Sequence, residues 1–288
     1  MRWVPGTRGS IDDQRGRSPV MRAGLPLGIG GVLILLVGSW LTGTDLFSLL
    51  GGGDAQVSAP TSESAPVNST PAEEKVVDMV GAVADDLQTT WSEILRGRFQ
   101  RTKVVLFRDA VDSACGTAQS ATGPFYCPSD RQIYLDLSFF RQLGGRLGAP
   151  GEFAEAYVVA HEFGHHIQTL IGTDANMRAA QRRSPGSANG LSVAMELQAD
   201  CYAGVWGHAA MQPGRFLAGR VELERGDVDD GLRAAAAVGD DRLQRMGTGR
   251  VVPDSFTHGS SAQRSAWFKK GLDAGSPDAC DTFDSANR

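Results

Sequence analysis

The sequence lacks closely spaced cysteines and an excess of basic residues. Its 288 residues contain four cysteines, and no two of them form a C-x-x-C pair. This spacing argues against a zinc site made of thiolates and against a thiol redox motif. Lys and Arg number 28 against 33 Asp and Glu, for a net charge of −5 at pH 7, so the composition gives no support to nucleic-acid binding. The length suits one sizeable core, and no long internal repeat is present.

Charge is also missing from residues 23–44, a stretch long enough to supply the ~20 residues needed to cross a bilayer as a helix. Arginines precede this stretch, the last being Arg22, and no Lys or Arg follows until Lys75. The positive-inside rule then places residues 1–22 in the cytoplasm and the rest of the chain outside. We expect a single-pass protein of the cytoplasmic membrane. The alternatives are a buried core helix and a cleaved signal peptide, although no clear cleavage site follows the stretch.

Residues 45–74 contain little that could be buried. From residue 51 onward this segment is mostly Gly, Ser, Ala, Pro and Thr with acidic residues, a composition typical of a flexible tether. The globular domain is therefore expected over residues 75–288.

The most informative motif is His161-Glu162-Phe163-Gly164-His165, which fits the H-E-x-x-H pattern. On a helix, His161 and His165 lie about 40° apart on one face, so both imidazoles can reach one metal ion. Glu162 lies beside this pair and can act as a general base on a water molecule. The apolar spacing predicts a helix over Glu152–Ile171 that ends at Gly172. A glycine inside this helix, Gly164, suggests close approach of another backbone.

A catalytic zinc site needs a third protein ligand, and the candidate lies in a second predicted helix at about 191–207. Glu196 and Asp200 are four residues apart, so their carboxylates share one helix face. We assign Glu196 to the metal and Asp200 to a hydrogen bond with a ligand histidine. The alternative is that both are solvated surface carboxylates. The small residues Ala199 and Ala203 favour the first interpretation, because they suit close packing of the two helices.

These motifs resemble the putative neutral zinc metallopeptidases, a family of bacterial single-pass membrane proteins. The order H-E-x-x-H then E-x-x-x-D also resembles, more distantly, the gluzincin peptidases, in which the later Glu is the third zinc ligand. Further similarity runs over nearly the whole chain, at Met1-Arg2-Trp3, 123–128, 134–140, 239–244 and 258–261. The resemblance implies a zincin-like α+β peptidase fold with a bound Zn²⁺ and a peptide or protein substrate.

The elements around the two motifs fit that fold class. Helical periodicity is present over 76–95, strand-like sequence over 102–107 and 133–137, and further helical sequence over 221–246. We expect a small antiparallel sheet before the metal-binding helix, where it could hold an extended substrate by edge pairing. A purely structural hairpin is the alternative.

The four cysteines are expected to form disulfides outside the membrane. Of the three possible pairings we favour Cys115–Cys127 and Cys201–Cys280, the second of which would tie the C-terminal tail to the helix carrying Glu196. Two or more buried free thiols remain the alternative.

Two further histidines, His166 and His258, are candidates for the site. His258 could donate to a developing oxyanion, although a structural histidine at the start of a helix is the commoner case. His166 is rotated about 100° from His165 and is expected not to bind the ion.

The sequence therefore predicts a membrane-anchored zinc metallopeptidase with Glu162 as the catalytic base. An alternative is a membrane-anchored binding or scaffolding protein with a structural or vestigial zinc site, which would not need Glu162. Hydrolysis of a cell-wall amide is a third possibility.

Overall fold

The computed structural model describes residues 1–17 and 67–283. Within them, Met1–Gly16 belong to the same compact unit as the chain after residue 66. This differs from the separate N-terminal tail expected over residues 1–22. The predicted tether also ends early, because helix α3 (Pro71–Leu95) begins at Pro71 with the Thr70 hydroxyl capping it.

A four-stranded sheet forms one part of this unit, with the strand order β1-β2-β6-β5. Its strands are β1 (Ile11–Asp13), β2 (Val104–Phe107), β5 (Phe125–Cys127) and β6 (Gln132–Asp136). β1 and β6 both run parallel to β2, and only β5 is antiparallel to its neighbour. The prediction of an antiparallel sheet was therefore wrong: the sheet is mixed, because β2 pairs in parallel both with β6 and with β1 from the N-terminus.

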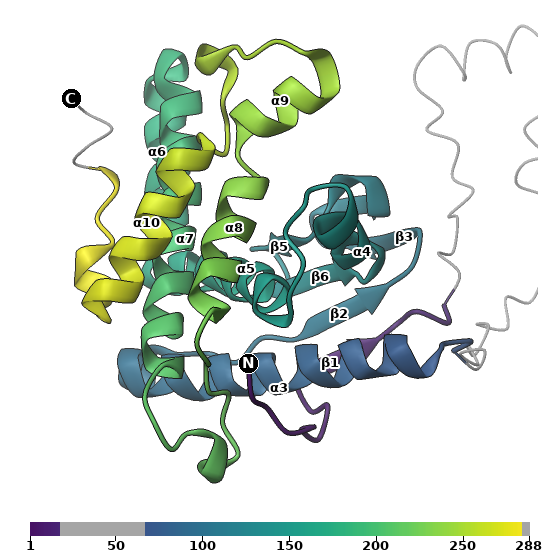
Figure 1. Ribbon diagram of the computed structural model, residues 1–288. Coiled ribbons are helices and arrows are strands. Elements are labelled where there is room, and N and C mark those ends of the chain that lie inside the picture. The colour runs from purple at the N-terminus through teal and green to yellow at the C-terminus, as the bar shows by residue number, and fades with distance from the viewer. Residues whose placement is uncertain (18–66, 284–288) are drawn as a thin grey trace, which may run out of the picture. The chain divides into compact units, whose positions relative to one another are not determined.

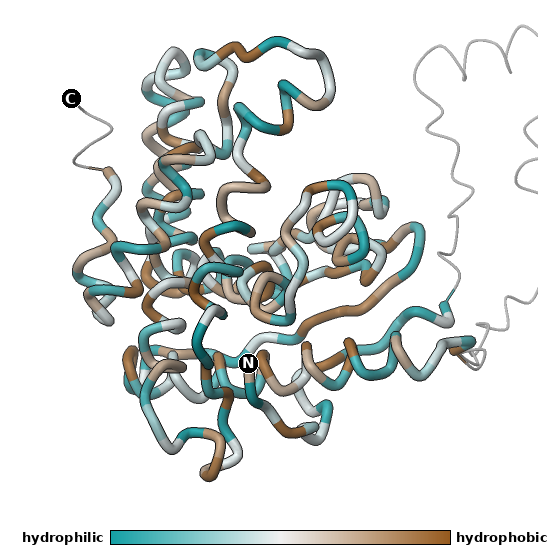
Figure 2. Tube along the Cα trace, viewed as in Figure 1, coloured by the Kyte–Doolittle hydropathy of each residue, from teal (hydrophilic) through white to brown (hydrophobic). Residues whose placement is uncertain are grey.

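The two faces of the sheet pack against different elements. Val104, Leu106 and Leu135 pack with the helices, whereas Val105 and Tyr134 pack with a two-stranded hairpin. That hairpin consists of β3 (Ala110–Ser113) and β4 (Gly116–Gln119). Because side chains alternate between faces and both faces are covered, every residue of β2 is buried. Figure 2 accordingly shows β2 as hydrophobic along its length.

Helices make up the rest of the unit (Figure 1). Besides α3, the α-helices are α4 (Ser138–Gly145), α5 (Glu152–Ile171), α6 (Thr173–Arg183), α7 (Ala188–Ala210), α8 (Asp227–Ala237), α9 (Asp240–Thr248) and α10 (Ser261–Ala274). α5 lies at the centre, in contact with α3, α7 and α8, and α10 packs along α7 and α8. The single helical segment expected over 221–246 is in fact α8 and α9.

Two glycines allow the helices to pack this closely. A Cβ on Gly164 of α5 would lie 2.8 Å from Ala199 Cα of α7. A Cβ on Gly271 of α10 would overlap the Cys201 carbonyl oxygen of α7. Gly164 therefore has the close backbone neighbour that its position suggested, and α7 is held between α5 and α10.

Both expected disulfides are present, Cys115–Cys127 and Cys201–Cys280. The first joins the turn between β3 and β4 to β5, and the second joins the C-terminal segment to α7. The four cysteines leave no free thiol. The free-thiol alternative is therefore wrong.

Among residues 1–17 and 67–283, no helix combines the length and hydropathy needed for a membrane span. The span expected over residues 23–44 lies outside the described part of the chain.

Candidate metal centre

The H-E-x-x-H motif lies in the middle of α5, where it faces a cleft. His161 and His165 are one turn apart, with ring centroids separated by 4.8 Å. Both side chains line the cleft together with Glu162 and Glu196. His161 and Glu162 are each only 7% exposed, so the motif is at the bottom of the cleft rather than on the surface.

Glu196 of α7 completes a three-ligand cluster. Its Oε2 is 3.1 Å from His161 Nε2, and its Oε1 is 3.5 Å from His165 Nε2. One ligand atom from each of the three residues lies within 4.8 Å of the other two. Two imidazole nitrogens and one carboxylate oxygen are a donor set that suits Zn²⁺ and leaves a fourth tetrahedral position open. The cluster therefore fits a catalytic type of zinc site.

In both imidazoles the second ring nitrogen, Nδ1, is within hydrogen-bond distance of a side-chain oxygen. His161 Nδ1 is 2.9 Å from Asp200 Oδ1, and His165 Nδ1 is 2.9 Å from Gln168 Oε1. The Gln168 amide is itself oriented, because its Nε2 donates to the Met195 carbonyl at 2.7 Å. Each Nδ1–H thus has an acceptor, which leaves each Nε2 free to bind metal. Sequence reasoning found Asp200 and missed Gln168, although Gln168 lies at i+3 from His165 on the same helix face.

Asp200 is completely buried and is paired with Arg264 of α10. Arg264 Nε and Nη2 donate to its two carboxylate oxygens at 2.8 and 2.9 Å, a bidentate ion pair. The Tyr157 hydroxyl also donates to Asp200 Oδ1. Arg264 and Tyr157 were not predicted as site residues. Nothing in the sequence near Arg264 indicates that α10 crosses behind the metal ligands.

The charges in the cluster shift the pKa values of its members. Burial lowers the pKa of His161, but Asp200 and Glu196 outweigh burial and raise it to about 9. Burial raises the pKa of Glu196, but His165 and His161 bring it well below its usual value. Protons and a metal ion therefore compete for the same Nε2 atoms, and the carboxylate of Glu196 stays ionised.

Glu162 differs from the other carboxylates of the site. Among the residues described, none donates a hydrogen bond to it. Burial raises its pKa, while the two ligand histidines oppose that shift. A buried carboxylate with no fixed partner is free to accept a proton from a nearby water molecule and to release it again.

The remaining histidines have separate positions. His166 Nε2 donates to the Gln100 carbonyl at 2.7 Å, and its Nδ1 is 3.1 Å from the Tyr126 hydroxyl, so it is not part of the cluster. His258 lines the cleft with its side chain 52% exposed. Asp240 holds it there by accepting from its backbone N–H at 2.7 Å.

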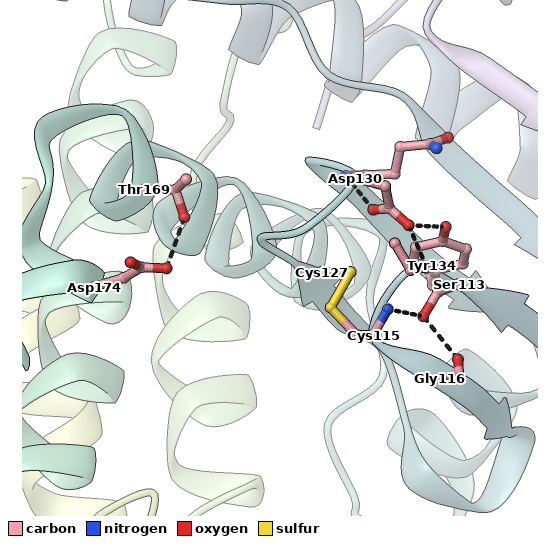
Figure 3. Close-up of a disulfide and its surroundings, with 10 residues drawn as sticks. Ser113, Cys115, Gly116, Cys127, Asp130, Tyr134, Thr169 and Asp174 are labelled. Carbon is pink, nitrogen blue, oxygen red and sulfur yellow. Dashed lines mark hydrogen bonds between the residues drawn. A yellow bond between two sulfur atoms is a disulfide. The ribbon is translucent and has the colours of Figure 1, made fainter. Parts of the chain in front are cut away.

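The cleft has a volume of about 600 Å³, within the range of ordinary ligand sites. Its apolar lining includes Phe125, Tyr126, Phe139, Met177 and Met195. Two of these residues belong to β5, the strand at the end of the sheet, and Cys127 follows them directly. Figure 3 shows the Cys115–Cys127 disulfide beside Asp130 and Tyr134, whose hydroxyl donates to Asp130 at 2.7 Å. The disulfide therefore supports the strand that forms one wall of the cleft.

Comparison with known proteins gives one family and several uncharacterised relatives. The uncharacterized protein YpfJ of Escherichia coli K12 is 42% identical over 297 residues, covering 98% of this chain and 99% of its own. The uncharacterized protein Rv2575 of Mycobacterium tuberculosis H37Rv is 46% identical over 212 residues, covering 72% of this chain and 71% of its own. No solved structure matches the chain.

The family described as "Putative neutral zinc metallopeptidase" matches residues 1–283, a range that includes the N-terminal strand, the His161/His165/Glu196 cluster and the C-terminal disulfide. Together with the coverage of YpfJ, this match means that the chain belongs to the putative neutral zinc metallopeptidase family.

Proposed function

We propose that this protein is a zinc-dependent metallopeptidase that hydrolyses peptide bonds in the cleft above α5. The observation that carries the proposal is the position of Glu162, a buried carboxylate without a hydrogen-bond partner among the described residues, next to a three-ligand cluster. A purely structural zinc site has no use for such a base. The scaffolding alternative therefore accounts for less of the geometry.

Each residue of the site would have its own role in the reaction. His161, His165 and Glu196 would hold the ion, and Asp200 and Gln168 would orient the two imidazoles. Bound zinc supplies Lewis acidity, which lowers the pKa of a water molecule towards about 7 and polarises a carbonyl group. Glu162 would accept the proton of the attacking water and deliver it to the leaving amine. His258, on the cleft wall, is the candidate donor to the developing oxyanion.

The cleft favours an extended peptide with apolar side chains. Its walls are largely apolar, and β5 has β6 as its only strand neighbour in the described sheet. An extended peptide could pair with the free side of β5 while its side chains enter the apolar walls. A cell-wall amide fits such largely apolar walls less well than a peptide with apolar side chains does.

We further propose that the protein is attached to the cytoplasmic membrane through residues 23–44, with the catalytic unit outside the cytoplasm. The apolar stretch supports attachment. Two disulfides support an oxidising compartment, because such bonds are rare in the cytosol.

The test is Glu162→Gln compared with wild type and with Glu155→Gln, which makes the same change on the same helix away from the ligand cluster. The substrates are quenched fluorescent peptides with apolar residues around the cleaved bond. Glu162→Gln should bind one zinc per chain, as wild type does, and lose hydrolysis by several orders of magnitude. Glu155→Gln should keep both properties. Chelator-sensitive hydrolysis that survives in Glu162→Gln would disprove the assignment, and a folded wild type without zinc would favour the scaffolding alternative.

A further inference from the structure

The first 16 residues are built into the catalytic unit through backbone hydrogen bonds. In β1, Ile11, Asp12 and Asp13 pair with Val104, Val105 and Leu106 of β2. At the two ends of this pairing, Val104 N–H donates to the Ser10 carbonyl at 2.9 Å and Gln14 N–H donates to the Leu106 carbonyl at 2.8 Å. β1 therefore completes one side of the sheet.

Side chains hold the same segment against α3, which Figure 1 shows running beside β1. Arg8 forms ion pairs with Glu74 and Asp78 at 2.7 and 2.6 Å. Ser10 donates to Asp85 at 2.5 Å. These contacts extend over more than two turns of α3. The N-terminal segment is therefore bound to α3 at several positions along the helix.

Arg15 joins the end of the N-terminal segment to the first turn of α3. Its side chain is 1% exposed and contacts Glu73 and Glu74 in the first turn of α3, each at 2.8 Å. Within the described unit, the end of the N-terminal segment and the start of α3 therefore lie side by side.

We propose that residues 1–16 and the catalytic unit lie on the same side of the membrane, so that the apolar stretch 23–44 does not separate them. A bilayer core is about 30 Å thick, whereas β1 and β2 are hydrogen-bonded and Arg15 touches α3. This topology replaces the single span with a cytoplasmic N-terminus that the positive-inside rule predicts, and it does not depend on the proposed hydrolysis.

The test compares two exposed positions in the full-length protein, Thr7→Cys in the N-terminal segment and Ser92→Cys on α3. Each variant is expressed in cells, and spheroplasts are treated with a membrane-impermeant maleimide before and after permeabilisation. Wild type serves as the control, because all four of its cysteines form disulfides and should not react. A cytoplasmic thiol protein reports whether the reagent stays outside.

Equal labelling of Thr7→Cys and Ser92→Cys is the expected result, whether both react in intact spheroplasts or both react only after permeabilisation. Labelling of one position with protection of the other would overturn the proposal. Both substitutions are on the surface, and disulfide formation, read from mobility on non-reducing gels, verifies that each variant is folded. The same experiment in a Glu162→Gln background gives the same answer if topology and catalysis are independent.

Discussion

The two imidazoles of the candidate metal site, His161 and His165, are oriented by different kinds of partner. His161 donates to a buried carboxylate, Asp200, whose charge is balanced by Arg264. His165 donates to a neutral amide, Gln168. A carboxylate acceptor raises the basicity of its imidazole more than an amide does, so His161 is expected to be the stronger of the two histidine ligands.

Gln168→Ala should weaken zinc binding by about 10- to 100-fold, because His165 loses the acceptor that fixes its ring. The matched control is Gln181→Ala, which removes a half-buried glutamine whose amide donates to Ala188 and Ser192 away from the ligands. Zinc affinity is measured by competition with a chromophoric chelator at fixed pH. Equal affinities for the two variants would show that Gln168 has no orienting role.

In zinc-free protein, kept so with a chelator, Arg264→Gln should lower the free energy of unfolding by about 3–5 kcal/mol. The reason is that the Asp200 carboxylate would remain buried without the guanidinium group that balances its charge. The double variant Arg264→Gln/Asp200→Asn removes both charges and should recover part of this loss. Urea denaturation of wild type, both single variants and the double variant gives the coupling free energy. Additive effects in this cycle would mean that the ion pair does not act as a unit.

Sequence alone identified the residues whose relation is local. His161, Glu162 and His165 lie within five positions on one helix, and Glu196 and Asp200 are one turn apart on another, so helix periodicity places each set on a face. Arg264 could not be found in this way. It is 64 residues from Asp200 in the chain, and its role exists only because α10 packs against α7.

At the level of helices, the geometry of the candidate metal site depends on how closely α5 and α7 approach each other. Gly164→Ala should destabilise the protein by about 1–3 kcal/mol, since the added methyl would overlap Ala199 and push α7, with Glu196, away from the histidines. This loss outweighs the ~1 kcal/mol that alanine gains over glycine inside a helix. The free energy of unfolding is measured by chemical denaturation, and zinc affinity alongside it.

The control for that substitution is Gly190→Ala in the first turn of α7, where an added Cβ has no neighbour within 4 Å. It should be neutral or slightly stabilising. If Gly164→Ala behaved like Gly190→Ala, the close contact between α5 and α7 would have no energetic importance.

The helices differ in how well their limits could be predicted. α5 has the predicted bounds, because its apolar pattern is regular and Gly172 ends it in a left-handed conformation. The segment 221–246 is interrupted at Gly239, where an added Cβ would overlap the Ser261 backbone, and Asp240 then begins α9. That interruption comes from a contact with α10, which periodicity does not reveal.

For the whole molecule, the sheet could not be derived from local sequence. β1 pairs with residues about ninety positions away, and three residues carry too little alternation to predict a strand. The sequence predicted strands before α5, and β2 and β6 are there, but their parallel pairing does not follow from the local pattern of either strand. Charge asymmetry around residues 23–44 suggested the opposite arrangement, in which residues 1–22 are remote from the rest.

Zinc should stabilise the whole fold, and the stabilisation should increase as the pH rises from about 6.5 to 9. In protein kept free of zinc by a chelator, the fold raises the pKa of His161 from 6.5 to about 9. Protonation of His161 therefore stabilises the fold, and this contribution is fully present below pH 6.5. That contribution is lost as the pH passes through 9. Zinc requires the neutral imidazole, so proton competition weakens it at the lower end of the same window.

The measurement is the melting temperature at pH 6.5, 7.5 and 8.5, with a chelator or at a fixed free zinc concentration. At 100 times the Kd, zinc would add about 2.7 kcal/mol to the free energy of unfolding. Because the Kd falls as the proton leaves His161, the difference between the two conditions should grow at each step. Glu196→Ala, which removes one ligand, should show a much smaller shift at every pH. A zinc-induced shift that stayed constant or shrank towards pH 8.5 would mean that the ion is not held by the His161 imidazole.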